Sequence, residues 1–169
     1  MTRLPVTLAA IGLALTTLTY TGCDVLAEPS SLDYESPPPA YVSMISAVNA
    51  ARAHPRTCGS ESFGAAGPVS WNGRLERAAY THTADMVLND YFDHVGSDGS
   101  TVGTRVSRVG YNWRRVGENL AHANRSAEEV VNLWLASPGH CANLMHPSFT
   151  EIGINEQDGY WTQVFGRQR

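Results

Sequence analysis

Two short alternating segments joined by a tight turn lie near the end of the chain, and this hairpin constrains the fold most. Residues 151–155 alternate apolar and polar side chains, Gln157-Asp158-Gly159 favours a turn, and residues 160–165 predict the returning strand. The segments before the hairpin have helical spacing instead. Helices followed by one small antiparallel sheet indicate an α+β fold and not a parallel α/β fold.

Two helices are predicted in the first half of the folded sequence. The first has an apolar face that begins at Tyr41, and it stops near His54-Pro55 because a residue before proline disfavours helical geometry. The second follows Asn72, a good N-cap residue. His82 lies on its apolar stripe, so we expect a buried core histidine there.

Two more helices are predicted before the hairpin. A turn at residues 97–100 precedes a short helix, on which Arg105 and Arg108 are expected to face solvent. Residues 126–129 form a capping box for a fourth helix, which is predicted to stop at residues 137–139. Asn119, between these helices, is predicted to be a turn residue.

Residues 1–22 have the pattern of an export signal. Arg3 supplies the positive start, and the apolar run over 6–18 is too short for a comfortable transmembrane helix. Cys23 then resembles the lipidated residue of a bacterial lipobox, although Tyr20 stands where Leu is usual. Residues 25–27 offer a rival cleavage site for a freely secreted protein. We favour the lipoprotein, since a lone Cys just past the apolar run otherwise has no role.

The rest of the chain is expected to form one folded domain behind a tether. Residues 23–40 are rich in Pro and Ser without an apolar period, which predicts an extended linker. Residues 41–169 then form the domain. This arrangement predicts an exported protein that is held at a membrane by Cys23 or released.

The remaining two cysteines, Cys58 and Cys141, form an even pair in a chain expected to reach an oxidising compartment. A bridge between them would contribute about 4 kcal/mol in the chain-entropy model. Two buried free thiols, or a metal pair of Cys141 with His140, are weaker alternatives.

Composition excludes some functions. All 12 basic residues are Arg, which excludes Schiff-base chemistry on Lys. The net charge of −4 favours no nucleic-acid partner.

Two imidazoles and one carboxylate stand in rigid or turn-forming sequence: His94, Glu118 and His140. Brought together, a His and a Glu could act as a base and the group that orients it. Two His and one Glu also suit a catalytic zinc ion with an open position. Alternatively, Glu118 is structural and the histidines are its hydrogen-bond partners. No convincing nucleophile stands nearby, because Pro138 and Gly139 separate Ser137 from His140.

Several ordered motifs resemble those of the CAP superfamily, the SCP-domain proteins that include cysteine-rich secretory proteins, venom allergens and plant pathogenesis-related proteins. They are Gly117–Ala121, Trp134 and Gly159–Gly166, and residues 137–143 and 149–153 resemble the bacterial branch. The resemblance spans Tyr41 to Gly166. It implies an α-β-α sandwich of about four helices around a small antiparallel sheet.

The resemblance also implies a cavity and a function. Many eukaryotic members carry two His and two Glu, sometimes with zinc; His94 and Glu118 match the first of each, while Ser137 and Tyr160 replace the others. His140 is the expected substitute. Since family members bind lipids, sterols or cell-surface polymers, the resemblance implies a binding module of the cell envelope. A zinc-dependent hydrolase that uses His94, Glu118 and His140 is the alternative.

Overall fold

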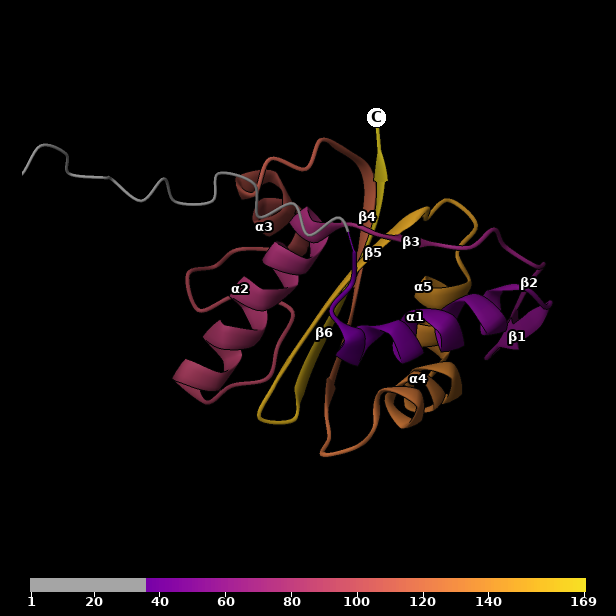
Figure 1. The fold of residues 1–169 in the computed structure, drawn as a ribbon, viewed down its shortest axis with the longest axis horizontal. Coiled ribbons are helices and arrows are strands. Elements are labelled where there is room, and N and C mark those ends of the chain that lie inside the picture. The colour runs from indigo at the N-terminus through magenta and orange to yellow at the C-terminus, as the bar shows by residue number, and fades with distance from the viewer. Residues whose placement is uncertain (1–35) are drawn as a thin grey trace, which may run out of the picture. The chain divides into compact units, whose positions relative to one another are not determined.

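The computed structural model describes residues 36–169, shown as the coloured ribbon in Figure 1. The predicted export signal at 1–22, the lipidated Cys23 and most of the 23–40 tether lie outside the described residues and remain predictions. No helix within residues 36–169 is long and apolar enough to cross a membrane.

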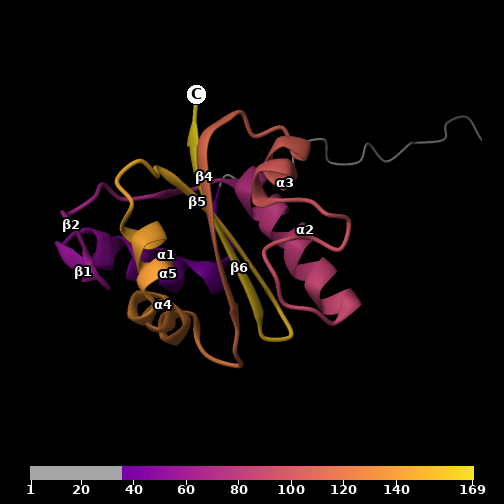
Figure 2. The same ribbon diagram turned by 180° about the vertical axis from the view of Figure 1, so that it is seen from behind.

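A four-stranded sheet separates two layers of helices in residues 36–169 (Figures 1 and 2). The strand order is β3-β5-β6-β4, in which β5 and β6 form the predicted hairpin and β4 pairs antiparallel with β6. Helices α2 and α3 cover one face, and α1, α4 and α5 cover the other. The elements are α1 (Pro39–Arg52), β1 (Arg56–Cys58), β2 (Glu61–Phe63), β3 (Ser70–Trp71), α2 (Gly73–Asn89), α3 (Val102–Arg108), β4 (Trp113–His122), α4 (Ala127–Ala136), α5 (Pro138–Met145), β5 (Glu151–Gln157) and β6 (Tyr160–Gln168).

This arrangement confirms the α+β fold and the α-β-α sandwich. The described residues contain five helices where about four were expected, and the short strand β3 pairs parallel with β5. Helix α1 begins at Pro39, ahead of the expected start at Tyr41. Proline suits the first turn because the N–H that it lacks would have no partner there.

Helix α2 is capped as predicted, and it lies directly against the sheet. The Asn72 side chain accepts hydrogen bonds from the backbone N–H groups of Arg74 (3.0 Å) and Leu75 (3.2 Å). The helix crosses β5 at Gly153, where an added Cβ would overlap the backbone at the Leu75–Glu76 peptide. This close approach sets the position of α2, and therefore of the loop that follows it.

Helix α5 was missed in the sequence. Helix α4 ends at Ala136 with Ser137 as its C-cap residue, close to the predicted stop. A new helix then begins directly at Pro138. Cys141 on α5 is joined to Cys58 on β1, with the two Cα atoms 5.5 Å apart. The predicted disulfide is therefore confirmed, and it attaches the β1–β2 hairpin to the helical layer.

Strand β4 was also missed, and it carries the centre of the candidate site. It forms one edge of the sheet and includes Asn119, which pairs in register with Gln163 of β6. The expectation that Asn119 is a turn residue was wrong. Because side chains alternate along a strand, Glu118 and Asn119 point to opposite faces of the sheet.

Candidate functional site

The carboxylate of Glu118 is the centre of a buried polar network. Its side chain is 3% exposed. Oε1 accepts a hydrogen bond from His94 Nδ1 at 2.8 Å, and Oε2 accepts one from Arg105 Nη2 at 2.7 Å. A buried carboxylate with a buried guanidinium forms a strong charge-assisted contact, which depends on both partners being present.

Arg105 lies inside the protein, so its predicted solvent exposure was wrong. Its side chain is 2% exposed. Besides Glu118, the guanidinium donates to the backbone carbonyls of Ser100 (2.9 Å) and His94 (3.1 Å). Arg108, in contrast, is exposed and pairs with Asp98. Local spacing could not reveal the burial of Arg105, because its partner Glu118 lies on a separate strand.

His94 is the part of this network that reaches solvent. Its side chain is 57% exposed, although Nδ1 is bound to Glu118. The hydrogen bond to Glu118 raises the pKa of His94 above its ordinary value, and burial opposes this effect. With Nδ1 engaged, Nε2 is the ring nitrogen left for a ligand or a proton.

His82 of α2 is fully buried, which confirms the expected core histidine. Its Nε2 lies 2.9 Å from the carbonyl oxygen of Asp93 and 4.0 Å from Glu118 Oε1. Burial lowers the pKa of His82, so the ring is neutral at pH 7. His82 and Arg105 thus hold the carbonyl groups of Asp93 and His94, and together they fix the loop that presents His94.

We expect the pKa values of His94, His82 and His140 to lie on different sides of the ordinary histidine value of 6.5. NMR pH titration of the ring protons should give His94 a pKa above 6.5, and His82 and His140 values below it. Because the His94 pKa is higher in the folded than in the unfolded state, the His94–Glu118 contact stabilises the fold. This contribution is complete below the pKa of the unfolded state and is lost as pH rises through the pKa of the folded state. A His94 pKa at or below 6.5 would contradict the contact.

A second polar group lies on the other face of β4. The Asn119 amide donates to the His140 carbonyl (3.2 Å) and to Gln163 Oε1 (3.1 Å), and its oxygen accepts from Asn143 (3.1 Å). Asn143 also donates to the Glu118 carbonyl at 3.1 Å. These contacts join α5 to the edge strand and leave the His140 ring half-buried, with its pKa lowered by burial and then by the charge of His94.

The predicted metal site does not fit this arrangement. Both oxygens of Glu118 already accept hydrogen bonds, one of them from the Arg105 cation, which opposes a second cation there. The His140 ring is near enough to His94 for the charge of His94 to lower its pKa, but no hydrogen bond or ion pair joins it to Glu118 among the described residues. Across residues 36–169, no three His, Cys, Asp or Glu side chains are grouped to hold a metal ion.

Ser137 and Tyr160, which replace the expected family residues, make no hydrogen bond with Glu118 among the described residues. Ser137 is the N-cap residue of α5, and no hydrogen bond joins its hydroxyl to His140 among the described residues. Tyr160 stacks on His122, with 3.8 Å between ring centroids. Neither residue completes a catalytic group with His94.

Tyr160 instead belongs to an aromatic cluster that sequence analysis did not identify. Phe92 lies 6.1 Å from His122 and 6.2 Å from Tyr160 between ring centroids, and 49% of Phe92 is exposed. Tyr160 shares a sheet face with Val164, which packs in the α2 core and pairs with Glu118. We call Phe92, His122 and Tyr160 the aromatic cluster.

The aromatic cluster and the Glu118 network therefore lie on one face of the β4–β6 pair. His122 stands four positions after Glu118 on β4, which is about 13 Å along a strand. The loop from Phe92 to His94 connects the two ends. Val95 and Leu88 beside this loop are also exposed. The surface thus offers an imidazole at one end and aromatic rings at the other.

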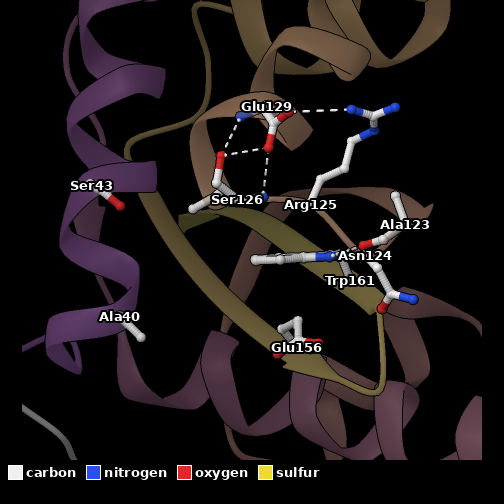
Figure 3. Close-up of a pocket in the computed structure, with 10 residues that line it drawn as sticks. Ala40, Ser43, Ala123, Asn124, Arg125, Ser126, Glu129, Glu156 and Trp161 are labelled. Carbon is white, nitrogen blue, oxygen red and sulfur yellow. Dashed lines mark hydrogen bonds and ion pairs between the residues drawn. The ribbon is translucent and has the colours of Figure 1, made fainter.

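A separate hollow lies between the start of α1 and the loop from β4 to α4 (Figure 3). Its polar groups are already engaged: Trp161 donates to the Ala123 carbonyl at 3.0 Å, and Ser126 and Glu129 form the predicted capping box. Arg125 pairs with Glu129 at the rim. The polar groups that line this hollow therefore cap α4 and hold Trp161, and we assign no ligand to it.

Comparison with known proteins identifies relatives of this chain. The sequence model described as "Cysteine-rich secretory protein family" matches residues 45–165. The uncharacterized protein YkwD of Bacillus subtilis is 33% identical over 100 residues, which cover 58% of this chain and 39% of YkwD. The membrane protein YlbC of the same organism is 29% identical over 97 residues and is covered over 28% of its length. The chain thus spans well under half of these relatives.

Solved structures share the fold. An extracellular protein of Bacillus anthracis that contains an SCP domain superposes with a TM-score of 0.59 and 31% identity, covering 61% of this chain and 35% of that one. An outer surface protein of Borrelia burgdorferi gives a TM-score of 0.57 at 19% identity, covering 76% of this chain and 96% of that one. At this lower identity the likeness shows the fold alone.

Proposed function

The chain belongs to the cysteine-rich secretory protein family, the CAP superfamily, and from this membership we propose that it is an exported binding module of the bacterial cell envelope. The likeness to an extracellular SCP-domain protein at 31% identity supports export. The predicted signal at 1–22 and a lipid anchor at Cys23 would hold the domain at the membrane, and cleavage at residues 25–27 would release it.

The observation that carries the proposal is the surface between the aromatic cluster and His94. Phe92 is 49% exposed and Val95 is 49% exposed, beside an imidazole that is fixed by a buried carboxylate. An apolar end and a polar end on one rigid face suit an amphipathic ligand. We infer a lipid, a sterol or a cell-surface polymer whose apolar part lies on Phe92 and whose polar part reaches His94.

Binding should depend on both ends of this surface. In the full chain, we expect the double substitution Phe92→Ala with His94→Ala to weaken binding at least about tenfold, since each lost contact is worth roughly 1 kcal/mol. The probes are sterol-containing phosphatidylcholine vesicles and purified peptidoglycan, measured by sedimentation. The fold should persist because Arg105 still pairs with Glu118.

Leu133→Ala is the matched control for this test. Leu133 is 46% exposed on α4, in the opposite layer of the sandwich, so its loss should leave binding unchanged. Wild-type binding to neither probe, or full binding by the double variant, would overturn the proposal.

Hydrolysis is the second candidate, favoured by one contact. His94 Nδ1 is held at 2.8 Å by Glu118, which is how a carboxylate orients a general base. Against it, Cys58 and Cys141 are bridged and the Ser137 hydroxyl has no bond to His140. Stoichiometric zinc in the purified chain, lost together with hydrolytic activity in His94→Ala, would favour this candidate over the binding module.

A further inference from the structure

Three arginines line a hollow at the Trp113 end of β4, away from the aromatic cluster. Arg114, Arg115, Arg167 and Ser148 surround a space of about 370 Å³. The first two belong to β4, Arg167 belongs to β6, and Ser148 lies between α5 and β5. The hollow is thus cationic, although the whole chain has a net charge of −4.

The strand register brings the arginines together. Arg115 pairs directly with Arg167 across the antiparallel strands. The register shifts between Trp113 and Arg115, so Arg114 is the extra residue of a bulge, a feature that redirects side chains. Like charges directly opposite each other destabilise a sheet. Folding alone therefore does not account for this pair.

Both side chains of the pair face the layer that contains α5. A Cβ added to Gly117 would meet the ring of Phe149, so Gly117 faces that layer. Arg115, two residues away, has the same orientation, and its cross-strand partner Arg167 shares it.

No carboxylate neutralises these three guanidinium groups in residues 36–169. Among the described residues, the one polar side-chain atom near Arg115 Nη1 is His146 Nε2, at 3.1 Å. Other arginines of the described chain do have acidic partners: Arg105 with Glu118, Arg108 with Asp98, and Arg125 with Glu129.

Buried Arg52 adds to the positive field. Its guanidinium is fully buried and donates to four backbone carbonyls, including that of His146 at 3.1 Å. These carbonyls satisfy its hydrogen bonds but carry no net charge. Burial, Arg115 and Arg52 lower the pKa of His146, which favours the neutral ring. A neutral imidazole accepts at one nitrogen only, and the Ser148 backbone N–H already donates to Nδ1 at 3.1 Å, so Nε2 carries the proton and does not satisfy Arg115.

We propose that this hollow, which we call the arginine hollow, binds a phosphate group. Guanidinium forks match phosphate oxygens two at a time, and the Ser148 hydroxyl supplies a further donor. An anion between Arg115 and Arg167 removes their repulsion. The phosphate belongs to a soluble phosphoester or to an anionic lipid headgroup. The inference does not depend on the proposed function, because the arginine hollow and the aromatic cluster are separate surfaces.

Two probes distinguish these sources in the full chain. Inorganic phosphate is titrated by NMR, and vesicles of phosphatidylglycerol in phosphatidylcholine are compared with pure phosphatidylcholine vesicles. We expect Arg115→Gln with Arg167→Gln to weaken binding at least about tenfold, since hydrogen bonds between charged groups are worth more than 1 kcal/mol each. Arg56→Gln, at an exposed arginine of β1, is the charge control and should change binding less than about twofold.

Stability separates binding from a structural role. Removing a like-charged pair should leave the melting temperature of the double variant unchanged or raise it, whereas loss of a structural contact would lower it. Phosphate binding without vesicle binding assigns a soluble phosphoester, and vesicle binding that the double variant loses assigns a lipid headgroup. Full binding by the double variant, or no binding of either probe by the wild type, overturns the proposal.

Discussion

Glu118→Gln is expected to lower the free energy of unfolding by about 3–5 kcal/mol, the usual effect of removing one partner of a buried ion pair. The guanidinium of Arg105 is 2% exposed and would be left inside the protein without a counter-charge. Gln keeps the size of the side chain, so a large loss would report the charge and not a cavity. Urea denaturation at pH 7 measures the change.

Two comparisons make the result specific. His94→Ala removes the half-exposed partner and should cost less than about 1 kcal/mol, as exposed pairs do. Glu118→Gln combined with Arg105→Met removes both charges and should recover most of the stability. A Glu118→Gln variant as stable as the wild type would show that the pair is more hydrated than its burial indicates.

The fold was predictable where the signals are local. The hairpin turn at residues 157–159, the Asn72 cap and the capping box at Ser126 each act within a few residues, and all three are present. Helix α5 was missed because Pro138 was interpreted as a stop, although proline also suits the first turn of a new helix. Strand β4 was missed because its pairing with β6 is not local.

The candidate site was predictable in part. Motif comparison selected His94 and Glu118, which are in contact. It could not find Arg105, because an arginine on a short helix is usually solvated and its counter-charge lies on a distant strand. It also grouped His140 with His94 and Glu118; the charge of His94 reaches the His140 ring, but no hydrogen bond or ion pair joins that ring to Glu118 among the described residues.

Gly153→Ala is expected to lower the free energy of unfolding by about 3 kcal/mol or more, which is at or above the usual cost of overpacking a core. A methyl group there would overlap the Leu75–Glu76 peptide of α2, and backbone atoms cannot rotate away as a side-chain end can. Helix α2 would have to move off β5, displacing His82 and the loop that carries His94. Denaturant midpoints measure the loss, and failure to obtain soluble folded protein would be its extreme form.

Gly139→Ala provides the matched control, because it adds the same methyl group where no atom lies within 4 Å. Gly139 is in the first turn of α5, so alanine there should be neutral or stabilising by up to about 1 kcal/mol. If both variants unfold at the same denaturant concentration, the tight contact of α2 with β5 is absent in solution. A loss confined to Gly153→Ala, accompanied by a fall of the His94 pKa toward 6.5, would show that this helix–sheet contact positions the candidate site.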